Sequence, residues 1–470
     1  MPSPTTPKNS ESVARAAFAG STALLLYTAI GYPILVAALS HLRPREVAKA
    51  EIELPTVTMI ITAYNEEAAI QAKIDNSLAL DYPREKLEII VVSDCSSDKT
   101  DEIVCNHPRN GENWGEVYLH RLPQRGGKTA AQNAAVERAR GEILLFSDAT
   151  SDYDAGVLRV LIPNFADPAV GCVAGRLIYV DPADSGVGQG ARSYWGYEIA
   201  LKKSESRLFS LIGVSGCLYA VRRSAYRPLP ADASSDFSIA GDMVAQGLRA
   251  VLEMDAICRE ETNRCVSKEL TMRTRIMTQT YRDLWRQRAL MNPRKTGFYA
   301  IQLWSHKVCR YAAPLFLTVG ALASLRLASK SKTHRFLVGA QAAIVAAAAL
   351  GAWLERRSVE KTASESRLVK VLALPRYFLI SNAAPVLALW KVLRGERFAQ
   401  WETAREMPIV PVETPVTEEK TSVLPPKITL TPSKTPDASP KMTVTAPETP
   451  FFLSEAAVAP AEVGASAQQP

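Results

Sequence analysis

The residues best suited to chemistry lie in one predicted turn, within the stretch Gly141–Asp154 (GEILLFSDATSDYD). Ile143–Phe146 is a short apolar run typical of a fully buried strand, and acidic and hydroxyl residues follow it at once. Because ligands in an open α/β sheet sit beyond the carboxyl ends of strands, Asp148 emerges where a polar ligand would be held. One carboxylate there suits Mg²⁺ on a diphosphate, since phosphate oxygens complete the shell of this ion. The alternative is a helix cap, a position that Asp154 already has.

The elements that must position this turn are strands that alternate with helices. The predicted strands are Thr56–Thr62, Leu87–Val92, a weaker Val117–Leu122 and Glu142–Phe146, and the predicted helices are Ala68–Leu80 and the Ala-rich stretch that ends at Ala139. This alternation predicts an α/β fold with a doubly wound, Rossmann-like, mostly parallel sheet. Three strand ends then deliver Asp94, Lys128 and Asp148 towards one rim of the sheet.

The second part of the soluble region, from Val170 to Gln302, mixes short strands with helical stretches. Its glycine-rich segment Gly186–Gly190 precedes an aromatic cluster that includes Tyr194 and Trp195. Aromatic faces can stack on sugars, and the alternative is ordinary helix packing.

Apolar stretches on both sides of this region predict a membrane protein. Ala16–Leu42 has no Lys, Arg, Asp or Glu, is long enough to span the roughly 30 Å hydrocarbon core, and lacks a clear cleavage site, so it predicts an uncleaved anchor. Of the later stretches Tyr311–Leu325, Phe336–Leu354 and Tyr377–Trp390, only the second has the length of a comfortable span. Prolines interrupt the other two, and one of the three is a candidate for an interfacial or re-entrant segment.

Composition excludes several other classes of protein. The net charge of the 470 residues is +7, and the basic residues next to the anchor, Arg43, Arg45 and Lys49, suit anionic lipid rather than nucleic acid. The seven cysteines form no CxxC pair and have no histidine at metal-site spacing, so they indicate reduced residues of a cytosolic domain.

These changes in composition divide the chain into four parts. They are an N-terminal tail and anchor (1–48), a cytosolic domain (49–305), a membrane region of about three helices (306–405) and a Pro/Thr/Ser/Glu-rich tail (406–470). The tail has few large apolar residues and is predicted to be disordered.

Four motifs in a fixed order resemble those of membrane-bound family 2 glycosyltransferases. They are AYNEE after the first strand, VVSDCSSD after the second, GGKTAAQNAA before the central strand and FSDAT at its end. The chain is similar to bacterial exopolysaccharide synthases of the cellulose, hyaluronan and poly-N-acetylglucosamine type over roughly Ala16–Arg405. The resemblance implies a GT-A domain inserted between transmembrane helices, a nucleotide-diphosphate sugar donor such as a UDP-sugar, Mg²⁺ or Mn²⁺, and inversion at the anomeric carbon.

The resemblance also assigns donor-binding roles. It implies that Tyr64, Asn65, Glu66 and Asp94 line the nucleobase and ribose pocket, that Lys128 lies near the diphosphate, that Asn133 matches the Asn of the GKxxALN segment, and that Asp148 is the first Asp of a DxD motif. Thr150 occupies the second acidic position of that motif, where its hydroxyl can help to coordinate a metal without adding charge. Asp152 could supply the missing second carboxylate of the motif if the turn folds back towards Asp148.

Two acids compete for the role of catalytic base, Asp236 and Asp242. In the related synthases, a glycine followed by an apolar and a basic residue lies eleven residues after the base, and Asp236 has this spacing to Gly247-Leu248-Arg249. Asp242 lacks the spacing and fits an exposed helical position, so Asp236 is the predicted base.

The QxxRW motif of processive synthases aligns with Met272–Ile276 and retains only Arg275. Its missing Trp removes an aromatic platform for the acceptor sugar. Arg273 and Arg275 are predicted to meet the diphosphate or the acceptor, and exposed helical arginines are the alternative. Trp285, Arg286 and Arg288 offer a second place for this function.

The implied activity is sugar transfer to a growing polysaccharide or lipid-linked acceptor by a multi-pass protein of the bacterial inner membrane with a cytosolic catalytic domain. The expected partners are the nucleotide sugar, this acceptor and membrane lipid. Nucleic acid is not an expected partner, and export or polymerisation proteins are further candidates. The lost Trp favours one alternative, transfer of a single sugar to a glycolipid or polyprenyl phosphate. Thr150 favours another, a degenerate nucleotide-sugar-binding assembly protein.

Overall fold

The strand ends that carry the predicted site belong to a sheet of eight strands in the computed structural model, which describes residues 7–180, 186–261, 266–358 and 367–400. The strands of this described part are β1 Val57–Ala63, β2 Leu87–Ser93, β3 Val117–Arg121, β4 Ile143–Asp148, β5 Asp152–Tyr153, β6 Val170–Val180, β7 Leu218–Arg222 and β8 Arg249–Glu261. Their order is β3-β2-β1-β4-β7-β6-β8-β5.

Most neighbouring strands of the sheet are parallel. β1 pairs in parallel with β2 and β4, β2 with β3, and β6 with β8, whereas β7 runs antiparallel to β4 and β6. The short strand β5 is antiparallel to β8. The predicted α/β fold with a mostly parallel sheet is therefore confirmed.

The helices fill both faces of the sheet and extend beyond it. The α-helices are α1 Pro7–Leu26, α2 Tyr32–Leu42, α3 Ile70–Leu78, α4 Thr100–Cys105, α5 Lys128–Arg138, α6 Val157–Leu161, α7 Gly186–Leu208, α8 Ser235–Ala245, α9 Val266–Arg286, α10 Pro293–Thr296, α11 Phe298–Gln302, α12 Cys309–Leu327, α13 Lys332–Ser358 and α14 Arg367–Leu393. π-Helical turns at η1 Tyr27–Gly31 and η6 Leu303–Val308 join α1 to α2 and α11 to α12.

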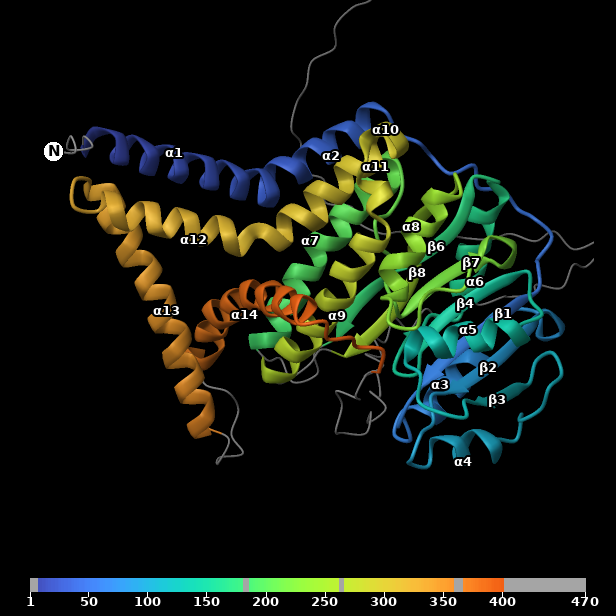
Figure 1. The fold of residues 1–470 in the computed structure, drawn as a ribbon. Helices are drawn as coiled ribbons and strands as arrows, with labels where there is room; N and C mark the ends of the chain where they lie inside the picture. The colour runs from blue at the N-terminus through green and yellow to red at the C-terminus, as the bar shows by residue number, and fades with distance from the viewer. Residues whose placement is uncertain (1–6, 181–185, 262–265, 359–366, 401–470) are drawn as a thin grey trace, which may run out of the picture. The chain divides into compact units, whose positions relative to one another are not determined.

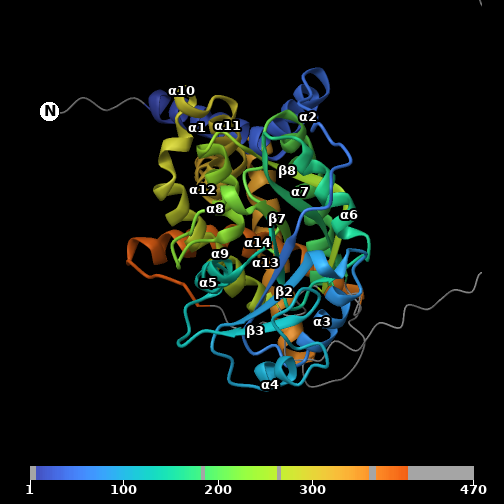
Figure 2. The same ribbon diagram turned by 90° about the vertical axis from the view of Figure 1, so that its right-hand side faces the viewer.

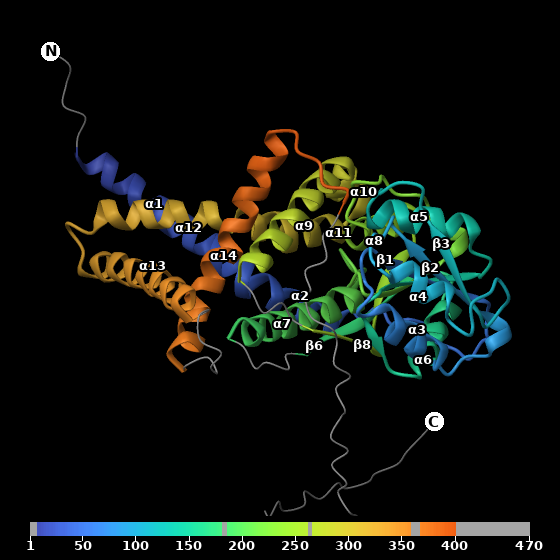
Figure 3. The same ribbon diagram turned by 90° about the horizontal axis from the view of Figure 1, so that it is seen from below.

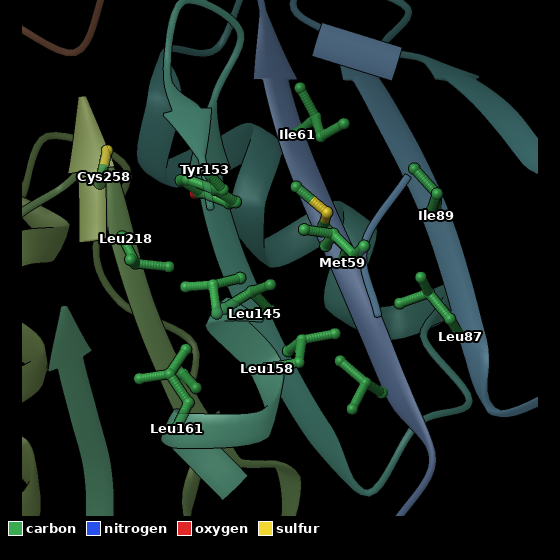
Figure 4. Packing of buried hydrophobic residues seen from close by; sticks show 14 of the residues in the cluster. Met59, Ile61, Leu87, Ile89, Leu145, Tyr153, Leu158, Leu161, Leu218 and Cys258 are labelled. Carbon is green, nitrogen blue, oxygen red and sulfur yellow. The ribbon is translucent and has the colours of Figure 1, made fainter. Parts of the chain in front are cut away.

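The central strands are buried on both faces because they are nearly continuous apolar runs. On one face, Met59 and Ile61 of β1 pack with Leu145 of β4 and Leu158 of α6 (Figure 4). On the other face, Ile60 belongs to a separate cluster that includes residues of α5 and α8. Figure 2 shows α5 and α8 on one side of the sheet and α3 and α6 on the other. Burial on both faces fixes the strand register, and with it the positions of the loops beyond the strand ends.

Three helical segments are long and apolar enough to cross a membrane. They are Ser10–Leu42, Phe298–Leu327 and Lys332–Leu354 among the described residues. α1 packs along α12, and α14 lies against α9 and α13 (Figures 1 and 3). The predicted anchor lies in the first segment, and the predicted tail 406–470 lies outside the described residues.

Two predictions about these elements are wrong. The stretch Tyr311–Leu325 was expected to be too short for a span, but the helical run starts at Phe298 and Pro314 lies inside α12 without ending it. Proline is tolerated in such helices because neighbouring helices and local adjustments compensate for the missing N–H. Asp154 does not cap α6, because its carboxylate pairs with Arg259 and no side chain caps this helix.

Candidate active site

Asp148 and Lys128 meet at the carboxyl edge of the sheet. Asp148 is the last residue of β4, and Lys128 is the first residue of α5. The C-terminal end of the strand and the N-terminal end of the helix therefore lie close together. Their side chains form an ion pair, and the Lys128 ammonium also donates to the Gly216 carbonyl at 3.3 Å. Burial opposes the charge of Lys128, but the carboxylates of Asp148, Asp236 and Glu260 together outweigh burial and raise the pKa of Lys128. The lysine is therefore a fixed positive charge.

Asp236 faces the same space from α8. The hydroxyl of Ser234 and the backbone N–H of Phe237, the latter at 2.9 Å, donate to its Oδ1. A Cβ atom on Gly216 would lie 3.3 Å from Lys128 Nζ and 3.8 Å from Asp236 Oδ2, so both groups border the space beside this glycine. Among the described residues Oδ2 accepts no hydrogen bond, so it is the oxygen of Asp236 that faces this space.

Asp242, the competing acid, lies elsewhere on α8. Its carboxylate accepts a hydrogen bond of 2.8 Å from Gln246, one turn further along the helix. Burial raises the pKa of Asp242, with Arg227 and Gln246 acting in the opposite direction. None of these neighbours belongs to the group around Lys128.

Arg275 of α9 completes the charged group. Burial lowers the pKa of its guanidinium, and the carboxylates of Asp236 and Asp148 act in the opposite direction, which places Arg275 within electrostatic reach of both. Arg273 has different contacts: an ion pair of 2.6 Å with Glu269 and a hydrogen bond to the hydroxyl of Tyr377 on α14. The two arginines therefore differ in surroundings although they are two residues apart.

Asp94 organises the glycine loop that precedes Lys128. Its side chain is fully buried, and its two carboxylate oxygens accept the N–H groups of Gly126 and Gly127 at 2.6 and 3.0 Å. The guanidinium of Arg125 lies 3.6 Å from the centre of the Tyr64 ring. The loops after β1 and β2 and the start of α5 thus form one wall.

Asn65 and Glu66 lie in the loop after β1, beside that wall. Asn65 has a left-handed backbone (φ 53°), and its side-chain oxygen accepts the N–H of Ser97 at 2.8 Å. The N–H of Glu66 donates to Thr100 Oγ1 at 2.8 Å. These contacts join the first two strand-end loops.

Some predicted site residues lie away from this group. The Asn133 side chain bonds to the hydroxyl of Tyr226 at 2.8 Å and to both backbone groups of Leu229, so its amide is engaged outside the group. Trp195 donates to the Leu177 carbonyl at 3.0 Å and packs on Tyr179. The side chain of Tyr194 lies outside the described residues. In the second candidate segment, Trp285–Arg288, Arg286 pairs with Asp232 at 2.5 Å and with Asp283 at 3.0 Å.

The turn after β4 offers oxygen ligands for a metal ion. Asp148 supplies a carboxylate and the half-buried Thr150 a hydroxyl, whereas Asp152 is exposed at the start of β5. Within the described ranges no three acidic, histidine or cysteine side chains cluster as a metal site. Hard oxygen ligands from one carboxylate, one hydroxyl and a bound diphosphate are a set that Mg²⁺ or Mn²⁺ accepts, so these residues fit such an ion.

The motifs did not identify two residues that support this turn. The buried Lys73 donates to the Ser151 carbonyl at 2.8 Å, and burial lowers its pKa to about 8. Glu260 of β8 accepts from the Ser151 hydroxyl at 3.0 Å. No sequence motif surrounds Lys73 or Glu260, so the sequence does not predict that either side chain bonds to Ser151.

Asp283 of α9, also missed, positions the segment that carries Asp236. Its carboxylate accepts the N–H of Ser234 at 2.8 Å and pairs with Arg286. Burial raises the pKa of Asp283 to about 6, against hydrogen bonds that lower it. An internal acid in α9 has no motif around it, so only the packing of α9 on α8 identifies this role.

The raised pKa of Asp283 predicts a pH-dependent stability difference between the wild type and Asp283→Asn. The folded protein binds a proton more readily than the unfolded chain between about pH 4 and 6, so the wild type should lose stability relative to the variant as the pH rises through this window. Across this window the free energy of unfolding of the wild type should fall by about 3 kcal/mol relative to that of the variant. Thermal unfolding midpoints in detergent across this range measure it, and a wild type that gains on the variant with rising pH would contradict the assignment.

Gly127→Ala is expected to disrupt the glycine loop. Gly127 has φ 91°, and a Cβ atom there would overlap with the carbonyl oxygen of Ala399, which lies against the loop. The strained backbone alone costs about 1–3 kcal/mol, so the unfolding midpoint and the donor affinity should both fall. Gly156→Ala is the matched control, because Gly156 has φ −81° and no atom within 4 Å of an added Cβ. Equal effects of the two substitutions would refute this view of the loop.

The fold and the site define a class. A mostly parallel sheet has at its carboxyl edge a DxD-like turn, a lysine at a helix N-terminus, a second acid and an arginine, which is the arrangement of a nucleotide-sugar-dependent glycosyltransferase of the GT-A type. Residues 58–229 match the model of glycosyl transferase family 2. The chain therefore contains a family 2 glycosyltransferase domain, and the predicted family is confirmed.

Curated relatives agree with this class over part of their length. A probable glycosyltransferase of Bacillus subtilis, YdaM, is 28% identical over 193 residues, 38% of this chain and 43% of that protein. The beta-monoglucosyldiacylglycerol synthase of Trichormus variabilis is 28% identical over 184 residues, 39% of each. The poly-beta-1,6-N-acetyl-D-glucosamine synthase of Staphylococcus aureus is 33% identical over 125 residues, 26% of this chain and 29% of that protein. The chain thus matches less than half the length of these relatives.

A solved structure matches more of the chain. The mannosyltransferase PcManGT of Pyrobaculum calidifontis, solved with GDP-Man and Mn²⁺, has a TM-score of 0.61 and 25% identity and covers 82% of this chain and 98% of its own. The GT-A fold class is therefore confirmed, with helices apolar enough to span a membrane on either side of the domain.

Proposed function

We propose that this protein is an inverting glycosyltransferase that moves a sugar from a nucleotide-diphosphate sugar, a UDP-sugar, to a growing polysaccharide or a lipid-linked acceptor. The observation that carries the proposal is the meeting of Lys128, Asp148, Asp236 and Arg275 at one edge of the sheet. Two acids and two cations in this arrangement supply a base, a metal ligand and charges for a leaving diphosphate. Mn²⁺ in the mannosyltransferase structure supports the use of a divalent cation.

Asp236 acts as the general base in this proposal. Its carboxylate takes the proton of the acceptor hydroxyl while that oxygen forms a bond to the anomeric carbon of the donor. The bond between this carbon and the diphosphate oxygen breaks, and the electron pair leaves with the nucleoside diphosphate. Attack from the side opposite the leaving group inverts the anomeric carbon. Ser234 and Phe237 hold Oδ1 of the base, which leaves Oδ2 for the hydroxyl.

Lys128 and Arg275 stabilise the charge of the leaving group. Both are partly withdrawn from water, where preorganised cations act more strongly on developing charge than in solution. Asp148 and Thr150 would hold the divalent cation, which, when bound, neutralises charge on the diphosphate. Tyr64, Asn65, Glu66 and the loop ordered by Asp94 form the wall proposed for the nucleoside.

Transfer of a single sugar to a lipid is the second candidate. Ile276 follows Arg275 where processive synthases carry Trp, so this helix offers no aromatic platform for a polymer end. One relative is a synthase of a glucosyldiacylglycerol, which supports a lipid acceptor. In both candidates the protein lies in the bacterial inner membrane with this domain in the cytosol.

A donor panel tests the activity and separates the candidates. Purified full-length protein in detergent is given several sugar nucleotides with Mg²⁺ or Mn²⁺ and a lipid extract, and release of nucleoside diphosphate is measured. The proposal expects release from one donor, with product size distinguishing a polymer from one sugar on an extractable lipid. Donor binding by calorimetry without release from any donor would refute the activity and favour an assembly protein.

A further inference from the structure

Lys202 is a buried cation that the proposed transfer does not use. It lies on α7 with its residue only 6% exposed. In the described part of the chain its ammonium donates one hydrogen bond, of 3.3 Å, to the Val214 carbonyl, and lies 5.1 Å from the Trp195 ring centre. Burial lowers the pKa of Lys202, with Glu198 and Asp236 acting in the opposite direction. A nearby anion would stabilise the charged form of this buried amine, which has one hydrogen-bond acceptor among the described residues.

The nearby carboxylates are committed to other groups. Glu198 pairs with His306 at 3.0 Å and with Arg310 at 2.6 Å. Glu205 contacts His306 at 2.9 Å and accepts from the hydroxyl of Tyr32 at 2.6 Å. Within the described ranges, neither forms an ion pair with Lys202. A full counter-charge for Lys202 would therefore come from outside this cluster.

Lys307 places a second ammonium between the base and the membrane helices. Its Nζ lies 5.3 Å from the ring centre of Phe237, the residue that follows Asp236, and 5.9 Å from that of Tyr311 on α12. It also acts on the pKa of Lys202, so the two lysines lie within electrostatic reach of each other. Asp236, Lys307 and Tyr311 thus mark a path from the base to α12.

An apolar groove begins where this path ends. Its volume is about 390 Å³, within the range of ligand pockets, and its walls come from α9, α12 and α14 and from the turns that carry Met291, Trp304 and Val308. Tyr281 and Trp285 of α9, Tyr311 and Leu315 of α12 and Leu389 of α14 are among the lining residues. Trp285 is 71% exposed and Leu315 62% exposed on this face. α12 belongs to a segment apolar enough to span a membrane, so the groove is suited to a lipid chain.

We propose that the groove and the two lysines bind a membrane lipid with a phosphate group next to its reacting hydroxyl. The chain lies between α9, α12 and α14, the phosphate lies at Lys202 and Lys307, and the hydroxyl reaches Asp236. Lysine ammonium groups bind phosphate as point charges, whereas a neutral polysaccharide would leave the charge of Lys202 uncompensated. The hydroxyl proton passes to Asp236, its oxygen bonds to the anomeric carbon, and the diphosphate leaves. This inference rests on the proposed function and names its acceptor.

Photoreactive lipids test the site without turnover. Full-length protein is placed in phosphatidylcholine nanodiscs with a diazirine-labelled phosphatidylglycerol or with diacylglycerol of the same chains, and cross-linked residues are identified by mass spectrometry. The phosphate-bearing probe should label the groove about 10-fold more than the neutral one, the effect of a contact worth about 1.4 kcal/mol. Equal labelling by the two probes, or displacement of the label by millimolar inorganic phosphate, would overturn a phospholipid as the occupant.

Variants locate the contact. Lys307→Gln and Lys202→Gln should each reduce labelling by phosphatidylglycerol about 5-fold or more, and Lys307→Gln carries the test if loss of the buried Lys202 prevents folding. Lys330→Gln is the control for general surface charge, because Lys330 pairs with Glu11 beyond the other end of α12. Ala312→Trp should fill the groove and abolish labelling, while Leu322→Trp, at an exposed site on the same helix, should not. Unchanged labelling in Lys307→Gln or Ala312→Trp would refute the site.

Separate outcomes distinguish this inference from the proposed function. Cross-linking needs no donor, and nucleoside diphosphate release needs no assignment of the groove. Release from a sugar nucleotide without specific labelling would refute only the acceptor. Specific labelling without release from any donor would refute the transferase instead.

Discussion

Asp236→Asn should lower the rate of sugar transfer by about 10²–10⁴-fold while the affinity for the donor stays close to that of the wild type. Asn keeps the shape of the side chain and can still accept hydrogen bonds from Ser234 and Phe237 at Oδ1. It cannot take a proton from the acceptor hydroxyl at the position of Oδ2. Release of nucleoside diphosphate measures the rate, and calorimetry with the donor measures binding.

Asp242→Asn is the matched control for this experiment. The same chemical change is made on the same helix, at a side chain that bonds to Gln246 and does not face Lys128. We expect its activity within a few-fold of the wild type. Full activity in Asp236→Asn, or equal losses in the two variants, would refute Asp236 as the base.

Asp148→Ala should reduce kcat/KM by about 10³-fold and remove most of the dependence of donor binding on Mn²⁺. Asp148 is the one carboxylate proposed to bind the metal, because Thr150 brings no charge to the second position of the motif. Its loss also removes the ion pair that fixes Lys128 beside the Gly216 carbonyl. Two of the charges proposed to act on the diphosphate are therefore affected at once.

Asp152→Asn provides the comparison for Asp148. It removes an acidic charge four residues along the same turn, from an exposed side chain on β5. Transfer rates and donor calorimetry with and without Mn²⁺ should show little change in this variant. Strong loss in Asp152→Asn together with normal Mn²⁺ dependence in Asp148→Ala would move the proposed metal site to Asp152.

The local patterns predicted the first strands of the sheet and the edge at which their loops meet. Apolar runs such as Thr56–Thr62 and Leu87–Val92 correspond to β1 and β2, because strands buried on both faces need continuous apolar sequence. Parallel pairing then brings their carboxyl ends to one edge, which explains why Asp94, Lys128 and Asp148 gather there. These relationships depend on short-range pattern and a general rule of sheet geometry.

The helical half of the site was much less predictable. Arg273 and Arg275 stand in one short segment of sequence, yet Arg273 pairs with Glu269 and Tyr377 while Arg275 lies near Asp236 and Asp148. Which face of α9 meets the sheet depends on its packing against α8 and α14. Asn133 shows the same limit, because its motif gives no sign that its amide bonds to Tyr226 and Leu229, which lie more than 90 residues further along the chain.

The sequence by itself determined the class of the domain, the acidic turn after the central strand and the segments apolar enough for a membrane. Only the tertiary structure decided which charges share a space. It brings Arg275 and Asp236 close to Lys128, joins Asp283 to the backbone of Ser234, and places Lys202 and Lys307 near Asp236 and Phe237. The physical reason is that strand ends are aligned by backbone hydrogen bonds of regular geometry. The helices, by contrast, are placed by side-chain packing between segments far apart in the chain.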